Sequence, residues 1–207
     1  MTAPDSQGLH PPVPPDTAAI EIRPVRPEDR PALQAGFDRL SERSRYRRFL
    51  SPHPRLTDAE LRYFTEVDHH DHEALVAIDT TSGHGVGIAR FIRSPVDHRV
   101  AELAVAVVDD WQGRGIGTRL AFALADRARE EGITAFTALV LTDNSLMLSI
   151  IRELGAVHDV HTEEGITELT VDLPEHGLGP VSNLLRAAAR GEIDAGTQQR
   201  PPVSLRA

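Results

Sequence analysis

The sequence predicts an α/β (α+β) fold in which a mixed, mostly antiparallel central sheet is flanked by helices on both faces. Two observations lead to this prediction. Short apolar segments with a period of two alternate with longer segments of helical period, and turns rich in glycine and proline separate them. The predicted order is β-α-α-β-β-β-α-β-α-β-β, and it occupies about residues 20–173 of the 207-residue chain.

The first strand and two helices are expected in the N-terminal third. A short alternating strand at 20–23 is closed by Pro24, because proline restricts the backbone that precedes it. Pro27 opens the first helix, whose apolar face is formed by Leu33, Phe37 and Leu40. Thr57 opens the second helix, and Glu60 three residues later completes a capping box.

The remaining elements are six strands and two longer helices. The strands are predicted at residues 74–78, 87–92, 100–108, 135–141, 157–161 and 166–173. One helix runs from Ile116 to about Glu131. The other runs from about Asn144 to Leu154, and Gly155 is placed to end it as a C-cap.

The composition indicates one domain with a tail at each end. Residues 1–18 contain five prolines and few large apolar groups, so we expect a disordered Pro-rich tail before a domain at 19–173. Residues 174–207 form a C-terminal tail in which Ser182 could cap a short helix.

Charge and composition exclude several classes of protein. The formal charge of -9 argues against a nucleic-acid binder, and no apolar run reaches the ~20 residues needed to cross a membrane. The N-terminus lacks the pattern of a secretion signal. The absence of cysteine removes disulfides, thiolate metal sites and a cysteine nucleophile, so we expect a cytoplasmic protein.

A glycine-rich loop between the strand at 100–108 and the following helix is the main candidate site. Its residues are Gln112, Gly113, Arg114, Gly115, Ile116 and Gly117, followed by Thr118. Glycines let the backbone bring its N–H groups close to a ligand, and the helix N-terminus adds unsatisfied donors and a partial positive charge. The loop is therefore predicted to bind an anion such as a pyrophosphate.

Three kinds of phosphate-binding loop could produce this pattern. A Walker loop needs a lysine after its last glycine, and the chain contains no lysine. A dinucleotide loop needs the spacing GxGxxG, which this loop misses by one residue, although Asp143 could serve as its acidic partner. The third pattern has Gln or Arg, two residues, Gly, one residue, and Gly or Ala, which Gln112, Gly115 and Gly117 match.

This third pattern resembles motif A of the GNAT N-acetyltransferase superfamily, whose loop holds the pyrophosphate of acetyl-CoA. The order of strands and helices is also that of the GNAT fold. The helix that opens at Asn144 resembles motif B, in which an Asn touches the pantetheine or phosphate region. Asn144 could equally be a simple N-cap, and the two roles are compatible. The resemblance implies that acetyl-CoA is the co-substrate, bound by residues 112–118 and Asn144.

The segment from Leu40 to Phe49 resembles the LSxxSxYxRF segment of bacterial protein lysine acetyltransferases. The resemblance implies a protein substrate acetylated on lysine. Read from the residues alone, the four arginines of this segment (Arg43, Arg45, Arg47 and Arg48) are either a solvated helix face or a contact for an acidic protein or for the 3′-phosphate of CoA.

Glu102 is the candidate general base. It interrupts an apolar strand just before the loop, and on an alternating strand it shares a face with two small residues, Ala104 and Ala106. Partial burial would make it a better base near neutral pH. An unpaired or ion-paired surface carboxylate is the alternative, although the resembled branch places its catalytic Glu at this strand position.

Two further roles in the reaction concern stabilisation of the thioester oxygen and protonation of the leaving thiolate. A backbone N–H near Val105 or Val107 could stabilise negative charge on the thioester oxygen. Many GNAT enzymes carry a motif B Tyr as general acid, but Ile151 stands at that position here.

The expected function is direct transfer of acetyl from acetyl-CoA to an amine, with two alternatives. These are acetylation of a small amine and a catalytically weak module that senses acetyl-CoA or binds a partner. No metal is expected, because the adjacent residues of the histidine cluster at 69–73 seldom reach one ion. A homodimer is a further expectation.

Overall fold

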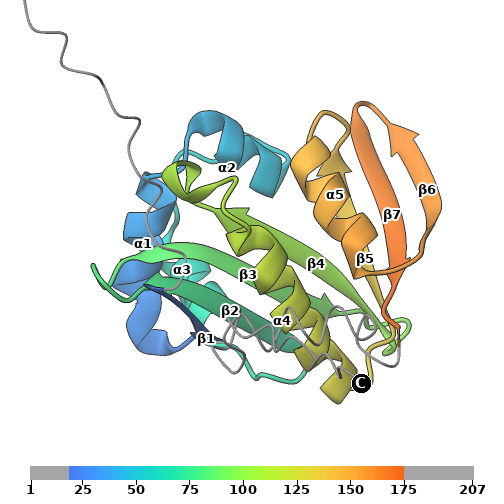
Figure 1. Ribbon diagram of the computed structural model, residues 1–207, viewed down its shortest axis with the longest axis horizontal. Coiled ribbons are helices and arrows are strands. Elements are labelled where there is room, and N and C mark those ends of the chain that lie inside the picture. Colours follow the sequence, from blue (N-terminus) through green and yellow to red (C-terminus); the bar gives the residue numbers. More distant parts are fainter. Residues whose placement is uncertain (1–18, 175–207) are drawn as a thin grey trace, which may run out of the picture.

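The computed structural model describes residues 19–174, and within them the chain forms a seven-stranded sheet in the order β1-β2-β3-β4-β5-β7-β6 (Figure 1). Neighbouring strands run antiparallel except β4 and β5, which are parallel. The predicted mixed, mostly antiparallel sheet is therefore confirmed. The tail predicted at 1–18 and, apart from Pro174, the tail predicted at 174–207 with the helix after Ser182 lie outside the described residues.

The N-terminal part supplies one edge strand and three helices. They are β1 (Ile20–Pro24), the 3-10 turn η2 (Pro27–Asp29), α1 (Arg30–Asp38), α2 (Glu42–Phe49) and α3 (Asp58–Thr65). The capping box at the start of α3 is confirmed, since the Glu60 N–H donates to Thr57 Oγ1 (3.2 Å) and the Thr57 N–H donates to Glu60 Oε2 (2.8 Å). The sequence-based order contained only two helices here, and α2 is the additional one.

The remaining strands and the two long helices lie where they were predicted, with ends that differ by at most two residues. The strands are β2 (His72–Asp79), β3 (Gly85–Arg93), β4 (Val100–Val107), β5 (Ala135–Leu141), β6 (Val157–Glu163) and β7 (Ile166–Asp172). The helices are the 3-10 turn η3 (Asp109–Trp111), α4 (Ile116–Glu130) and α5 (Ser145–Leu154).

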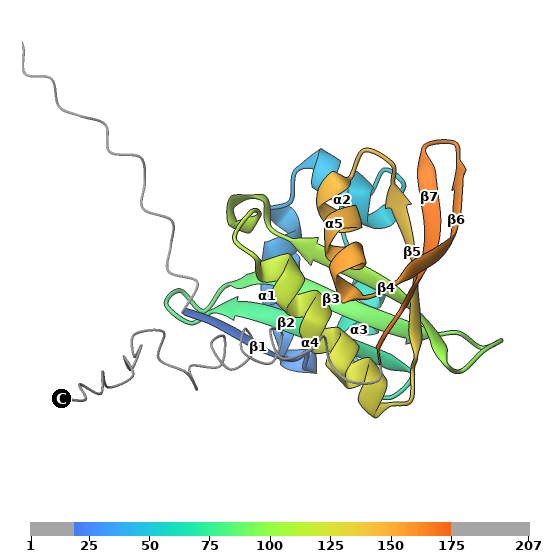
Figure 2. The same ribbon diagram turned by 45° about the vertical axis from the view of Figure 1, so that its right-hand side comes forward.

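Helices cover both faces of the sheet (Figure 2). On one face α4 and α5 pack over the main core, in which buried residues of α4 recur every turn (Ile116, Leu120, Leu124 and Ala128). Phe91 and Phe136 from β3 and β5 meet beneath them with ring centroids 6.2 Å apart. On the other face α1 and α3 enclose a smaller cluster containing Phe37 and Phe64.

The sheet opens between β4 and β5. Only three residue pairs join these strands, from Val100 with Ala135 to Glu102 with Thr137. By contrast, β4 stays paired with β3 as far as Val107, which lies opposite Gly87. The part of β4 beyond Glu102 therefore presents one edge of its backbone to a gap instead of to a strand.

Gly155 follows α5 as predicted, but the physical reason differs. A typical glycine C-cap adopts a left-handed conformation, whereas Gly155 is extended with φ 168°. A Cβ atom on Gly155 would lie 1.9 Å from the carbonyl oxygen of Asp172 on β7. Glycine is needed here because β7 passes too close for any side chain.

We expect Gly155→Ala to lower the free energy of unfolding by about 3 kcal/mol, because the neighbouring atom is backbone and cannot rotate away. Gly83→Ala is the matched control, since Gly83 has a positive φ but no atom within 4 Å of its Cβ position. This control should cost only ~1 kcal/mol. Urea unfolding of both variants tests the prediction, and equal losses would contradict it.

Candidate functional site

A cleft of about 420 Å³ occupies the gap between β4 and β5. Its walls come from both faces of the opening: β4 residues 102–107, the glycine loop, the first turn of α4, the end of β5, the start of α5, and the C-terminal half of α2. Residues far apart in the sequence thus meet at the point where the sheet opens. Every predicted cofactor-binding residue except Arg114 lines this cleft.

The glycines of the loop serve different purposes. Gly113 and Gly115 have left-handed φ values of 73° and 74°, with no atom within 4 Å of their Cβ positions. Gly115 is the N-cap of α4 and has no side chain, so it cannot accept a hydrogen bond from the first N–H groups of α4. Gly117 allows close packing instead, because a Cβ there would lie 3.1 Å from Ile150 Cδ1. The loop thus presents an uncapped helix N-terminus to the cleft.

The side chains of Gln112 and Arg114 contact other residues of the chain. Gln112 Nε2 donates to the Val107 carbonyl oxygen (2.9 Å) and to Ser44 Oγ (3.3 Å). The Arg114 guanidinium lies over the Trp111 ring, 4.9 Å from its centroid. Gln112 therefore fixes the loop to the end of β4, and both side chains are engaged within the chain.

Helix α2 is fastened to this loop by Asp109. The carboxylate accepts hydrogen bonds from the Ser41 N–H (2.9 Å), from Ser41 Oγ (2.7 Å) and from Ser44 Oγ (2.9 Å). Partial burial by itself would raise the pKa of Asp109, but the hydrogen bonds from the two serines outweigh it and hold the pKa below its usual range. Sequence reasoning did not identify Asp109, Ser41 or Ser44 as site residues, although both serines belong to the recognised segment.

Asn144 and Asp143 lie at the start of α5. Asn144 Oδ1 accepts from the Met147 N–H (3.3 Å), which confirms the N-cap role, and Asn144 also lines the cleft. Asp143 pairs with Arg43 (3.0 Å) and with Arg47 (3.7 Å) across from α2. It therefore binds arginines of this chain, which removes it as the acidic partner of a dinucleotide loop.

The side chain of Glu102 lines the cleft on the face of the sheet opposite α4. It is exposed, so partial burial does not contribute to its suitability as a base. Ala104 and Ala106 share its face and leave space above the strand.

Arg48 and Arg90 lie near Glu102. Burial, together with the charge of Arg90 and against the charge of Glu102, lowers the pKa of Arg48 to about 10.

The structure also places Val105 and Val107, the predicted donors to the thioester oxygen, and Ile151, which stands where many GNAT enzymes carry a Tyr. The side chains of Val105 and Val107 face α4, within 4.0 Å of the Cβ position of Gly117, and their backbone lies along the open edge of β4. Ile151 is fully buried in the main core, so its side chain does not enter the cleft. The position where a general acid was sought is therefore structural.

The histidine cluster before β2 belongs to an ion-pair network. His69 Nδ1 lies 2.8 Å from Glu73 Oε1, and Arg127 Nε lies 3.3 Å from the other oxygen of this buried carboxylate. His70 Nδ1 contacts Glu131. Within residues 19–174, no group of three or more side chains of the usual metal-binding types is arranged to hold an ion. No helix in this range has the length and apolar character to cross a membrane.

Known proteins match most of the described residues. A family model described as the acetyltransferase (GNAT) domain matches residues 19–157. Acetyltransferase Pat of Mycolicibacterium smegmatis is 39% identical over 181 residues, which are 86% of this chain and 54% of Pat. Acetyltransferase PA5475 of Pseudomonas aeruginosa is 31% identical over 144 residues, or 69% of this chain and 77% of that protein. The chain spans about half the length of Pat.

Solved structures share the fold. The GNAT domain of S. lividans PAT superimposes with a TM-score of 0.68 at 31% identity, covering 74% of this chain and 90% of that one. The putative acetyltransferase yncA from Salmonella typhimurium, solved with its cofactor acetyl-CoA, gives a TM-score of 0.61 at 22% identity, with coverages of 76% and 96%. At 22% identity, the similarity to yncA shows a shared fold alone.

We expect Asp109→Ala to release α2, because the change removes the acceptor for three hydrogen bonds. With ~1.4 kcal/mol lost, amide hydrogen exchange in residues 42–49 should become about ten times faster. Asp110→Ala is the control, since this exposed neighbour makes only a 3.8 Å ion pair with Arg39. Exchange measured by mass spectrometry should leave the control unchanged, and equal exchange in both variants would disprove the role of Asp109.

Proposed function

This chain belongs to the GNAT acetyltransferase family, and we propose that it transfers an acetyl group from acetyl-CoA directly to the side chain of a protein lysine. One observation carries the proposal. The opening between β4 and β5 joins an uncapped helix N-terminus on one side of the sheet to Glu102 on the other. A donor bound from one side could thus meet an acceptor from the other.

We assign the anion-binding loop to the pyrophosphate of acetyl-CoA. The backbone N–H groups of Gly113 to Thr118 would donate to the phosphate oxygens, and the positive end of α4 would attract them. The pantetheine arm would lie in the cleft along the open edge of β4, beside Asn144 at the start of α5. There its amides could pair with the backbone groups that β5 leaves free.

Glu102 would act as the general base. It would take a proton from the acceptor ammonium, and the neutral amine would attack the thioester carbonyl carbon. An N–H at Val105 or Val107 would donate to the oxygen on which negative charge develops. Collapse of the tetrahedral intermediate would break the carbon–sulfur bond, and the second proton that the nitrogen loses would pass to the sulfur, so that CoA leaves as a thiol. With Ile151 buried, we assign no side chain of α5 as the acid that protonates the sulfur.

The protein acceptor is supported by similarity to Pat and by the segment from Leu40 to Phe49. A small amine acceptor, and a module that binds acetyl-CoA without turnover, are the alternatives. Activity assays with protein and small-amine panels separate these functions. A cytoplasmic location and a homodimer stay predictions.

Gly115→Ala should weaken acetyl-CoA binding about tenfold, because its Cβ would occupy the open space above the N-terminus of α4. Gly132→Ala is the matched control, since Gly132 follows the other end of α4 with the same left-handed backbone and equally open surroundings. Both changes should cost ~1 kcal/mol of stability. Calorimetric titration with acetyl-CoA measures the difference, and equal affinities would place the phosphate elsewhere.

Glu102→Gln should lower kcat by about 10²–10³-fold while the dissociation constant of acetyl-CoA changes less than about twofold. The amide keeps the size of the side chain but cannot take the proton. Glu168→Gln, which neutralises an exposed carboxylate on β7, is the control and should stay fully active. Thiol release with a protein substrate measures turnover. Full activity of the Glu102 variant would remove Glu102 as the base.

A further inference from the structure

Two arginines near Glu102 have no carboxylate partner. Arg48, near the end of α2, and Arg90, on β3, form no ion pair with any residue between 19 and 174. Arg90 Nη1 is buried and makes no hydrogen bond. By contrast, Arg43 and Arg47 of α2 pair with Asp143, and Arg45 donates to the Pro54 carbonyl oxygen. Arg48 and Arg90 thus lie near Glu102 while neither is held in an ion pair by a carboxylate of the described residues.

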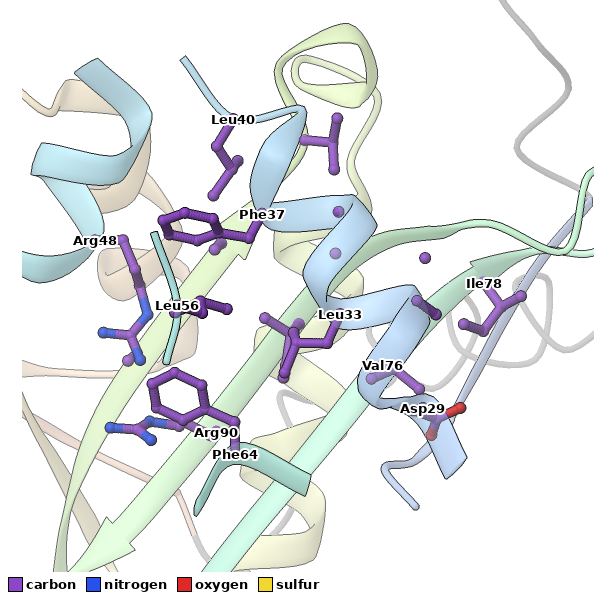
Figure 3. A pocket seen from close by; sticks show the side chains of 18 of the residues that line it. Asp29, Leu33, Phe37, Leu40, Arg48, Leu56, Phe64, Val76, Ile78 and Arg90 are labelled. Atoms are coloured by element: carbon purple, nitrogen blue, oxygen red, sulfur yellow. The ribbon is translucent and has the colours of Figure 1, made fainter. Parts of the chain in front are cut away.

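The surroundings of the pair are mostly apolar, and the polar neighbour that bonds to Arg90 is the uncharged side chain of Tyr63. Both guanidiniums line a pocket of about 70 Å³ between the sheet and helices α1 and α3 (Figure 3). The Arg90 guanidinium lies over the Phe64 ring at 4.7 Å from its centroid, and that of Arg48 lies over Phe49 at 5.0 Å. Asp29 lies at the opposite side of the view, and its carboxylate is held by Arg23 at 2.7 Å. No wall residue therefore neutralises the two arginines.

Sheet geometry places this pair beside the expected acceptor position. Arg90 lies opposite Ala104 on β4, so Glu102, two residues along on the same face, is its diagonal neighbour. Arg48 lines both the pocket and the cleft that contains Glu102. An acceptor amine that reaches Glu102 would therefore lie beside both guanidiniums.

Two positive charges at this place oppose an approaching ammonium group. The single negative charge of Glu102 offsets only one of them, so a lysine that brings no negative charge would be repelled. An acceptor with a carboxylate next to its amine would remove this repulsion. Guanidiniums bind carboxylates through paired, charge-assisted hydrogen bonds, which are strongest where water is excluded.

We propose that Arg48 and Arg90 form an anion subsite of the acceptor site, which binds the carboxylate of an Asp or Glu residue flanking the target lysine. The inference rests on the proposed transfer to a protein lysine and adds its local sequence preference. The apolar walls formed by Phe49 and Phe64 hold the guanidiniums in place through stacking, so the subsite exists before the acceptor arrives.

The test compares two peptides that each contain one lysine and differ only in having Glu or Gln on both sides of it. The native protein should acetylate the Glu peptide with a kcat/KM about ten times higher. In Arg90→Gln and Arg48→Gln this preference should fall below about twofold, through a higher KM for the Glu peptide. Arg62→Gln, which removes an exposed charge from α3, is the matched control and should keep the full preference.

Acetyl-CoA binding by calorimetry reports whether each variant keeps its fold, and Arg90→Lys provides a second variant that retains the charge. Arg90→Lys should keep part of the preference. Equal rates of the native protein on both peptides would overturn the subsite, as would an equal loss on both peptides in Arg90→Gln.

Failure of the proposed function has a different signature. If no peptide is acetylated but small amines that bear a carboxylate are, and Arg90→Gln raises their KM, the anion subsite stands and the protein acceptor is wrong. If Arg90→Gln leaves the KM of these amines unchanged, both proposals fail.

Discussion

The separation of β4 from β5 beyond Glu102 is the constraint on which the rest of the site depends. Three residue pairs hold these parallel strands together, and the remaining length of β4 is paired only with β3. The gap makes the cleft continuous through the sheet, so that α4 and the glycine loop reach it from one face and Glu102 from the other. A fully paired sheet would keep the donor and acceptor sides apart.

Polar contacts, more than apolar burial, position the third wall of the cleft. Helix α2 has no buried residue, and its N-terminus is held by Asp109, which lies three residues before Gln112, the first residue of the glycine loop. Ser44 contacts both Asp109 and Gln112, while Arg43 and Arg47 fix the other side through Asp143. Because these contacts are directional, the position of α2 follows that of the loop, and the acceptor side is coupled to the donor side.

Charge is distributed unevenly over this acidic protein. The formal charge is -9, yet arginines gather around the cleft, and those of α2 differ in their surroundings. Arg43 and Arg47 are neutralised within the chain, so the prediction of a solvated basic face describes them incompletely. Arg48, from the same short segment, is turned towards Arg90 and Glu102. Two adjacent residues of α2, Arg47 and Arg48, thus differ in that only Arg47 forms an ion pair with Asp143.

The sequence by itself determined the sheet elements, the two long helices, the loop and its family, because periodicity, caps and glycine spacing are local properties. It also located Glu102 and Asn144 beside that loop. It could not determine α2, which has no apolar stripe and is held by residues more than sixty positions away. The exposure of Glu102, the role of Gly155 and the unpaired state of Arg48 and Arg90 were likewise decided by the tertiary structure. Each depends on which distant backbone or side chain comes near, and no local pattern records that.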